Sequence, residues 1–273
     1  MTVQTFLKGG PVLRALQSLA LTCCMFATMA ADAQTVARNI VFIAIDDLRN
    51  WVNYAGDYAG TVHTPNIDAL AAVSTRYLNA YTAVPQCAGS RTTIMLGQSP
   101  ATHGIKSAAI SSSAYDDLYN DPGTVTLPEV LSQHGYHTAV AGKVFHKPEP
   151  ARWDESGPAT IIANLPGIGE PGPDNTFISA TVLPASEEHP DQTVANWAID
   201  FIDNYTAPEP FFLAVGFYQP HLPWRIPQWA YDLYPPAEVV TYSPPADDLG
   251  DEPPEAVELA LAPFLYGVLP QDE

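Results

Sequence analysis

Two short polar motifs in this sequence contain the residue types of a hydrolytic centre. The pentapeptide Cys87-Ala88-Gly89-Ser90-Arg91 combines a thiol with a guanidinium, and the acid pair Asp46-Asp47 lies upstream of it. Adjacent carboxylates are ligands that hard cations such as Ca²⁺ or Mg²⁺ prefer, whereas zinc prefers softer donors. A nucleophile could attack an anionic ester if a guanidinium and a bound cation offset the negative charge of the ester. The two motifs therefore indicate a hydrolytic site for anions.

Two further motifs place cationic and imidazole groups after predicted strands. The segment after one strand contains Lys143 and His146, and His221 follows another. Each motif also has an ordinary interpretation: the acid pair could cap a helix, the lysine could lie at the surface, and the histidine could pack in a turn. Because open parallel sheets hold their ligands at the carboxyl ends of the strands, polar motifs after several predicted strands favour one shared site.

The thiol of Cys87 is expected to lie in the loop before a helix that spans Ser90–Leu96. The helix dipole and Arg91 would lower the pKa of a thiol in this position, which would suit a nucleophile or a redox cysteine. The alternative is an inert buried cysteine. The neighbouring motifs favour a chemical role.

The pattern of apolar residues predicts strands that alternate with helices. Strands are expected over 39–45, 74–82, 136–141 and 211–217, and the first of them is expected to be fully buried. Helices are expected near 66–71 with Asn66 as a cap, from Thr126 with Glu129 in a capping box, and over 192–204. This order predicts an α/β fold with a mostly parallel, doubly wound sheet and helices on both faces.

The composition excludes some classes of partner. The chain has 273 residues, of which 47% are hydrophobic, and this length and composition suit one large core. Its net charge is −19. The negative charge would repel nucleic acid and anionic membranes, so neither is an expected partner. An anionic substrate would need local positive charge, a cation or helix N-termini at its site.

Residues 1–33 are expected to form a cleaved signal peptide. Lys8 and Arg14 precede the apolar run 15–30, and Ala31-Asp32-Ala33 offers small residues for cleavage near Ala33. The alternative is a membrane anchor, for which the apolar run is short. The protein is therefore expected to be secreted or periplasmic, with Cys87 as the one thiol of the mature chain.

Five segments together resemble the sulfatases of the alkaline-phosphatase-like superfamily, most closely the iduronate-2-sulfatase-like branch. The family signature is Cys or Ser, any residue, Pro or Ala, any residue, Arg, which Cys87 to Arg91 follows except at Gly89. The resemblance implies an alkaline-phosphatase-like α/β fold in which 34–273 form an incomplete, C-terminally truncated catalytic domain. The matching segments are 39–50, 63–70, 81–105, 142–148 and 218–234.

The resemblance implies that a formylglycine-generating maturation enzyme oxidises Cys87 to formylglycine. The hydrate of this aldehyde would attack the sulfur of a sulfate ester. An unmodified Cys87 thiol would be a poor nucleophile for this reaction. Asp46, Asp47 and the modified Cys87 would bind Ca²⁺, with Mg²⁺ as the less favoured cation. Gly89 departs from the signature that the maturation enzyme reads.

The other predicted catalytic residues handle charge around the ester. The resemblance implies that Arg91 orients the nucleophile and that Lys143 and His146 neutralise sulfate oxygens and assist deprotonation of the nucleophile. His221 would protonate or bind the bridging ester oxygen. The expected substrate is a sulfated carbohydrate, for which Trp224 and Arg225 could offer a platform and an anion contact.

Two alternatives to this function stay open. One is a phosphomonoester or phosphonate hydrolase of the same superfamily, which would use the same groups on phosphorus. The other is an inactive sulfatase-like remnant that binds sulfated glycans, since the remaining metal ligands of the family are expected beyond Glu273. A chain with Asp46, Asp47 and Cys87 alone is expected to bind metal weakly.

Overall fold

The computed structural model describes residues 37–106, 112–159, 180–221, 224–241, 243, 247–254 and 257. The chain divides into two units, Met1–Arg38 and Asn39–Glu273, and the helices and strands of the described residues lie in the second. The expected signal peptide, 1–33, lies outside the described residues. None of the helices in the described part of the chain has the length and hydropathy that a membrane span needs.

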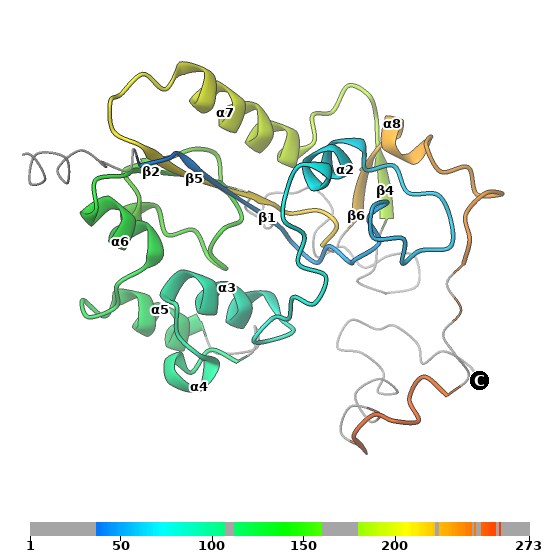
Figure 1. Ribbon diagram of the computed structural model, residues 1–273, viewed down its shortest axis with the longest axis horizontal. Helices are drawn as coiled ribbons and strands as arrows, with labels where there is room; N and C mark the ends of the chain where they lie inside the picture. Colours follow the sequence, from blue (N-terminus) through cyan, green and yellow to red (C-terminus); the bar gives the residue numbers. More distant parts are fainter. Residues whose placement is uncertain are drawn as a thin grey trace, which may run out of the picture. The chain divides into compact units, whose positions relative to one another are not determined.

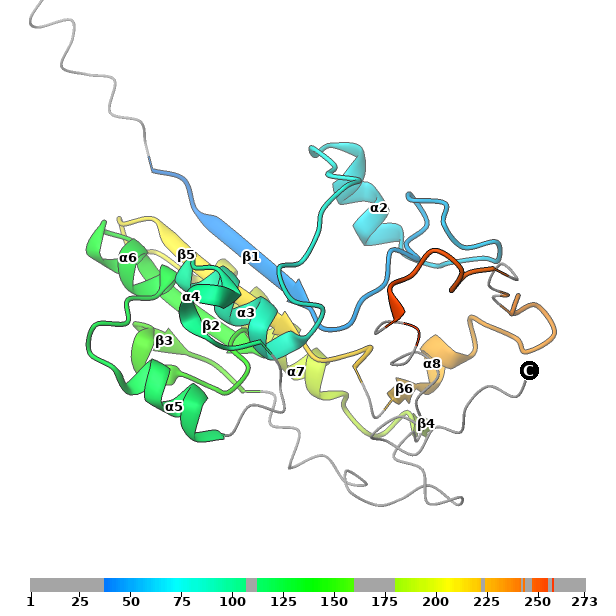
Figure 2. The ribbon, with the colours of Figure 1, turned by 90° about the horizontal axis from the view of Figure 1, so that it is seen from below.

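A parallel sheet forms the centre of the second unit. Its strands run in the order β1 (Ile40–Ile45), β5 (Phe211–Phe217), β2 (His137–Gly142) and β3 (Glu155–Ser156). All pairings among these four strands are parallel. Figure 1 shows β1, β5 and β2 side by side, and Figure 2 adds β3. The prediction of an α/β fold with a mostly parallel sheet is confirmed.

Helices cover both faces of this sheet. The helix α7 (Pro190–Asn204) lies on one face, and α3 (Cys87–Leu96), α5 (Ser112–Asn120) and α6 (Leu127–Gln133) lie on the other (Figure 1). Alternate residues of β5 supply the two cores, since successive strand side chains point to opposite faces. Phe211, Leu213 and Val215 pack with the α7 side, and Phe212 and Ala214 pack with the other.

Several smaller elements lie outside the four-stranded sheet. A second parallel pair is formed by β4 (Ala180–Leu183) and β6 (Trp224–Pro227), followed by the short helix α8 (Gln228–Tyr231). The remaining described elements are α2 (Pro65–Ala72), α4 (Pro100–His103) and a 3-10 turn, η1 (Pro150–Arg152).

Several local predictions need correction. The residues 74–82 form no strand, and Tyr77 and Tyr81 are 81% and 90% exposed. The strand β1 has its predicted position but is not fully buried, because Ile43 is 53% exposed. The helix α2 begins at Pro65 with Thr64 as the N-cap, so the predicted cap at Asn66 is wrong.

The capping box predicted at Thr126 is present. The Glu129 carboxylate accepts from both the backbone N–H and the hydroxyl of Thr126, at 2.8 and 2.7 Å. This cap fixes the start of α6, which leads directly into β2. The site residues that follow β2 therefore depend on a helix whose first turn is held by its own side chains.

Candidate active site

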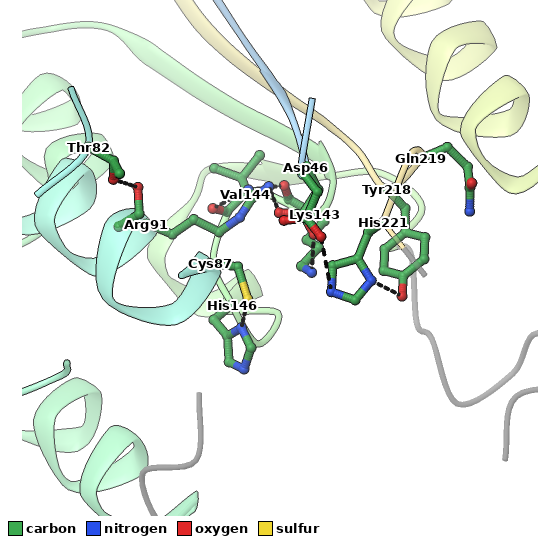
Figure 3. A network of polar contacts seen from close by, with 12 residues as sticks. Asp46, Thr82, Cys87, Arg91, Lys143, Val144, His146, Tyr218, Gln219 and His221 are labelled. Carbon is green, nitrogen blue, oxygen red and sulfur yellow. Dashed lines mark hydrogen bonds and ion pairs between the residues drawn. The ribbon is translucent and has the colours of Figure 1, made fainter. Parts of the chain in front are cut away.

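Three neighbouring strands, β1, β5 and β2, deliver the predicted site residues to one edge of the sheet. Their register pairs Ile45 with Phe217 and Gly142 with Gly216, so the strands end at the same level. The acid pair follows β1, the lysine and histidine motif follows β2, and His221 follows β5. Figure 3 shows Asp46, Lys143, His146 and His221 gathered near Cys87 in the first turn of α3.

Close contact between two glycines lets β2 turn into the site. A Cβ on Gly142, whose φ is +74°, would lie 2.0 Å from the carbonyl oxygen of Gly216. The N–H of Lys143 donates to that same oxygen at 2.8 Å. Only glycines permit this approach. The ammonium of Lys143, the next residue, donates to Asp46, which follows β1.

Asp46 is the centre of a buried charge cluster. Its Oδ1 accepts from Nη2 of Arg91 at 2.9 Å, and its Oδ2 accepts from Nζ of Lys143. Arg91 also donates to the carbonyl oxygen of Val144 at 3.0 Å. Burial alone would raise the pKa of Asp46, but the two adjacent cations outweigh burial and hold this pKa below its ordinary value. Asp46 is therefore an ionised carboxylate with both oxygens occupied.

Cys87 is the first residue of α3, with Gln86 as the N-cap, so the prediction that it precedes the helix is wrong. Its sulfur lies 3.5 Å from Nδ1 of His146. Burial raises the pKa of the thiol despite the nearby Lys143, which corrects the expectation of a lowered pKa. The same burial, with Lys143, lowers the pKa of His146. Both groups therefore favour their neutral forms.

Asp47 and His221 lie on the open side of the cluster. Asp47 has a φ of +56°, a region that residues other than glycine seldom adopt, and such strain is typical of functional sites. Its Oδ2 lies 3.8 Å from Nε2 of His221, and Nδ1 of that ring is 2.7 Å from the hydroxyl of Tyr218. The carboxylate is 56% exposed, so it can reach a ligand.

A cavity of about 490 Å³ opens beside these residues. Its polar lining includes Asp46, Asp47, Cys87 and Arg91, and its apolar lining includes side chains of β1 and α3. Ligand pockets commonly have this size and combine an apolar lining with a few convergent polar groups. The arrangement can hold an anionic group next to position 87.

The donors present agree in chemistry with a hard cation. Asp46 and Asp47 supply carboxylates, whereas calcium takes six to eight oxygen ligands. Within the described part of the chain, no cluster of three or more His, Cys, Asp or Glu side chains could hold a metal. The described residues therefore supply part of a coordination shell, and both oxygens of Asp46 already bind cationic side chains.

Two residues of the site were missed by sequence reasoning. Tyr218 directly follows β5 and contacts His221. Asp191, near the start of α7, accepts from the backbone N–H groups of Tyr218 and Gln219 at 2.8 and 2.9 Å. Tyr218 could have been found, since it occupies a strand end like the other site residues. Nothing in the local sequence marks Asp191.

Comparison with known proteins identifies the family. The sequence model of the Sulfatase family matches residues 38–251. A sulfatase from Formosa agariphila is 31% identical over 90% of this chain and 52% of its own length. Human iduronate 2-sulfatase is 31% identical over 83% of this chain and 42% of its own length. The chain spans about half the length of these relatives.

Solved structures share the fold. A phosphonate monoester hydrolase from Agrobacterium radiobacter aligns with a TM-score of 0.60 and 18% identity, over 86% of this chain and 52% of that one. A protein solved with its substrate, D-glucosamine-2-N,6-O-disulfate, aligns with a TM-score of 0.55 and 22% identity, over 79% of this chain and 40% of that one. These likenesses support the alkaline-phosphatase-like fold that the sequence predicted. With the family match over most of its length, the chain belongs to the sulfatase family.

Proposed function

We propose that this protein hydrolyses sulfate esters of a sulfated sugar. The observation that carries the proposal is the meeting of Asp46, Asp47, Cys87, Lys143 and His221 at one sheet edge. Arg91 and His146 join this group through their contacts with Asp46 and Cys87. An acidic protein can accept an anionic ester only where cations are concentrated, and this edge concentrates them.

Cys87 is proposed to act after oxidation to formylglycine by a maturation enzyme. The raised pKa of the buried thiol supports this, because a thiol that keeps its proton is a poor nucleophile. An aldehyde hydrate at the same position would offer hydroxyl groups to the ester and to His146, which lies 3.5 Å from the present sulfur. The modification would therefore replace an unreactive group with a competent one.

The neighbouring residues have proposed roles that follow from their contacts. Arg91 neutralises Asp46 through the hydrogen bond between them, and it is proposed to orient the group at position 87, which lies four residues before it in α3. Lys143 and His146 bind sulfate oxygens, and the neutral form that burial favours allows His146 to accept a proton from the nucleophile. His221 gives a proton to the bridging ester oxygen as the bond to sulfur breaks.

Asp46, Asp47 and the group at position 87 are proposed to bind Ca²⁺, with Mg²⁺ as the less favoured cation. The two carboxylates are hard oxygen donors, which support Ca²⁺ or Mg²⁺ as the bound cation and not Zn²⁺. A bound divalent cation would polarise a sulfate oxygen and stabilise negative charge. For Asp46 to bind the cation, the Lys143 ammonium has to move away from Oδ2 of Asp46 and toward the substrate. There it would bind a sulfate oxygen.

The proposed substrate class rests on relatives. Human iduronate 2-sulfatase bears the name of a sulfated sugar acid, and one protein of the same fold was solved with a disulfated glucosamine as its substrate. The leader-like residues 1–33 support a secreted or periplasmic location, where sulfated polysaccharides are accessible.

The proposal is tested by expressing the full chain with a formylglycine-generating enzyme and Ca²⁺. The mass of the peptide that contains Cys87 should show conversion of the thiol to an aldehyde, and the protein should cleave 4-nitrophenyl sulfate faster than 4-nitrophenyl phosphate. Cys87→Ala should abolish turnover. Preference for phosphate would instead support a phosphomonoester or phosphonate hydrolase. An unmodified Cys87 without turnover, in a protein that still binds sulfated glycans, would support an inactive remnant.

A further inference from the structure

Tyr218 is a buried tyrosine that contacts two of the proposed sulfate-handling residues. Its side chain is among the largest that are fully buried, with 2% exposure. Its hydroxyl lies 2.7 Å from Nδ1 of His221, and its ring face lies 5.0 Å from Nζ of Lys143 (Figure 3). No role has been assigned above to this residue, although a buried hydroxyl must be hydrogen-bonded to be tolerated.

We propose that Tyr218 is a positioning residue that keeps a hydrogen on Nε2 of His221 and directs this N–H toward Asp47 and the reacting ester. The proposal rests on the proposed function for its catalytic meaning, but its structural part concerns Tyr218 and His221 alone. Nε2 faces Asp47 Oδ2 at 3.8 Å, so the nitrogen on the far side of the ring from Tyr218 is the one that faces the site.

A hydroxyl differs from most other partners that a histidine ring nitrogen can have. A tyrosine hydroxyl can donate or accept, whereas a carboxylate or a carbonyl can only accept. When the imidazole is neutral, the hydroxyl donates to Nδ1 and the ring hydrogen stays on Nε2. When the imidazole is protonated, the hydroxyl accepts from Nδ1–H and Nε2 again carries a hydrogen. An acceptor-only partner would hold the hydrogen on Nδ1 and leave Nε2 of the neutral ring bare.

The environment of Tyr218 supports this arrangement. Burial, together with the nearby carboxylates, raises the pKa of Tyr218, so its hydroxyl keeps the proton that it donates. Asp191 fixes the backbone on which the tyrosine stands by accepting from its N–H at 2.8 Å. The hydrogen bond to this fixed tyrosine restricts rotation of the His221 ring. The centroids of the Tyr218 and His221 rings are 4.8 Å apart.

The consequence for the reaction is a proton donor that is aimed before the substrate arrives. In the protonated ring, the Nε2 proton passes to the bridging ester oxygen while that oxygen takes the electron pair of the breaking S–O bond. The ring leaves this step neutral, with its remaining hydrogen on Nδ1 accepted by the Tyr218 hydroxyl. The resting tautomer returns when Nε2 takes a proton from water and Nδ1 releases its own, after which the hydroxyl again donates to Nδ1. Pre-orientation of a general acid is worth most where the leaving group is a poor one, such as a sugar hydroxyl.

The direct test is the tautomer of His221 in the full chain, read by ¹⁵N NMR with the imidazole neutral and the signals assigned with His221→Gln. The wild type should show the hydrogen on Nε2. Tyr218→Phe keeps the ring over Lys143 but removes the hydroxyl, so it should show a mixture of both tautomers. Tyr119→Phe removes another buried hydroxyl, which bonds to Thr92 at 3.4 Å, and should leave His221 unchanged. A wild-type hydrogen on Nδ1, or an unchanged tautomer in Tyr218→Phe, would overturn the proposal.

Activity gives a second measurement that separates positioning from general structural damage. Tyr218→Phe should lower kcat about 10- to 100-fold on an alkyl or sugar sulfate and less than about threefold on 4-nitrophenyl sulfate, whose leaving group needs little protonation. Equal losses on both esters would contradict an action through His221. If the wild type cleaves neither ester, the proposed function fails, while the tautomer measurement still decides the role of Tyr218.

Discussion

Lys143 and Asp46 form a buried ion pair that joins the carboxyl ends of β2 and β1. Arg91, from α3, binds the other oxygen of the same carboxylate at 2.9 Å. Three elements distant in the sequence are therefore connected through one side chain that is 4% exposed. Two cations around one carboxylate leave a net positive charge, which suits a site for an anion.

Replacing the shared carboxylate should destabilise the protein strongly. Asp46→Asn leaves two buried cations without a counter-ion, and breaking such a cluster costs about 3–5 kcal/mol. Asp47→Asn is a matched control, because its side chain is 56% exposed and asparagine tolerates a φ of +56°. Urea denaturation should show the large loss of unfolding free energy in the first variant and less than about 1 kcal/mol in the second. Equal small losses would mean that the cluster does not stabilise the fold.

The parts of the fold that sequence predicted best are those that burial alone determines. The strand β5 was predicted at its observed residues, because an uninterrupted apolar run needs cover on both faces. The strand β1 has the same pattern but lies at one end of the strand order of its sheet, and Ile43 remains exposed. Sequence pattern reports which side chains can be buried, whereas neighbouring elements decide which of them are.

Other errors arose where the structure buries residues that the local sequence did not mark as buried. The helix α5 was not predicted because Ser112–Asn120 is rich in serine and aspartate, yet Tyr115 and Tyr119 anchor it in the core. The pKa of Cys87 was predicted with the wrong sign because burial raises it by more than the positive surroundings lower it. The convergence of the site residues was predictable, since it requires only that strands be parallel and end at one edge.

Gly89 offers a test of the departure from the family signature. A Cβ at this position would lie 2.8 Å from the carbonyl oxygen of Ile105 and 3.0 Å from the side chain of Val84. Gly89→Ala should therefore lower the unfolding free energy by about 1–2 kcal/mol, after the gain in helix propensity is counted. Gly123→Ala, whose Cβ would meet the Asp121 side chain at 3.3 Å, should be nearly neutral.

The same substitution restores the residue type that the signature prescribes. If the maturation enzyme reads the unfolded pentapeptide, Gly89→Ala should raise the fraction of Cys87 found as formylglycine by mass spectrometry, even though the folded protein is less stable. An unchanged fraction would show that position 89 does not limit conversion. A stability equal to that of Gly123→Ala would show that the Ile105 carbonyl can move aside.

His103 should contribute a pH-dependent part of the stability. Its Nδ1 accepts from the Ile105 N–H at 3.0 Å, and burial lowers its pKa below 6.5. The unfolded chain therefore binds a proton more readily, so this contribution is complete above pH 6.5 and declines as the pH falls toward the folded pKa. The slope can reach about 1.4 kcal/mol per pH unit.

His103→Asn isolates this contribution, because asparagine keeps an acceptor near the Nδ1 position and does not titrate. The difference in unfolding free energy between wild type and variant should shrink, or change sign in favour of the variant, as the pH falls from about 7.5 to 5.5. Other groups with shifted pKa values, such as His146, are present in both proteins and cancel in this difference. Parallel pH profiles would exclude His103 as the source.

Removal of Lys143 should separate its two roles. In the described structure its ammonium holds Oδ2 of Asp46, which is an oxygen that the proposed Ca²⁺ would need. Lys143→Ala leaves Asp46 paired with Arg91 alone, so the buried charges still balance and the fold should survive. Loss of a positive charge beside the cation site should raise Ca²⁺ affinity about tenfold or more, while sulfate-ester turnover falls.

Lys147→Ala is the matched control, since its ammonium pairs with Asp116 at 2.6 Å, and calorimetric titration should give it the wild-type affinity. Equal Ca²⁺ affinities in wild type and Lys143→Ala would show that Asp46 is not a ligand.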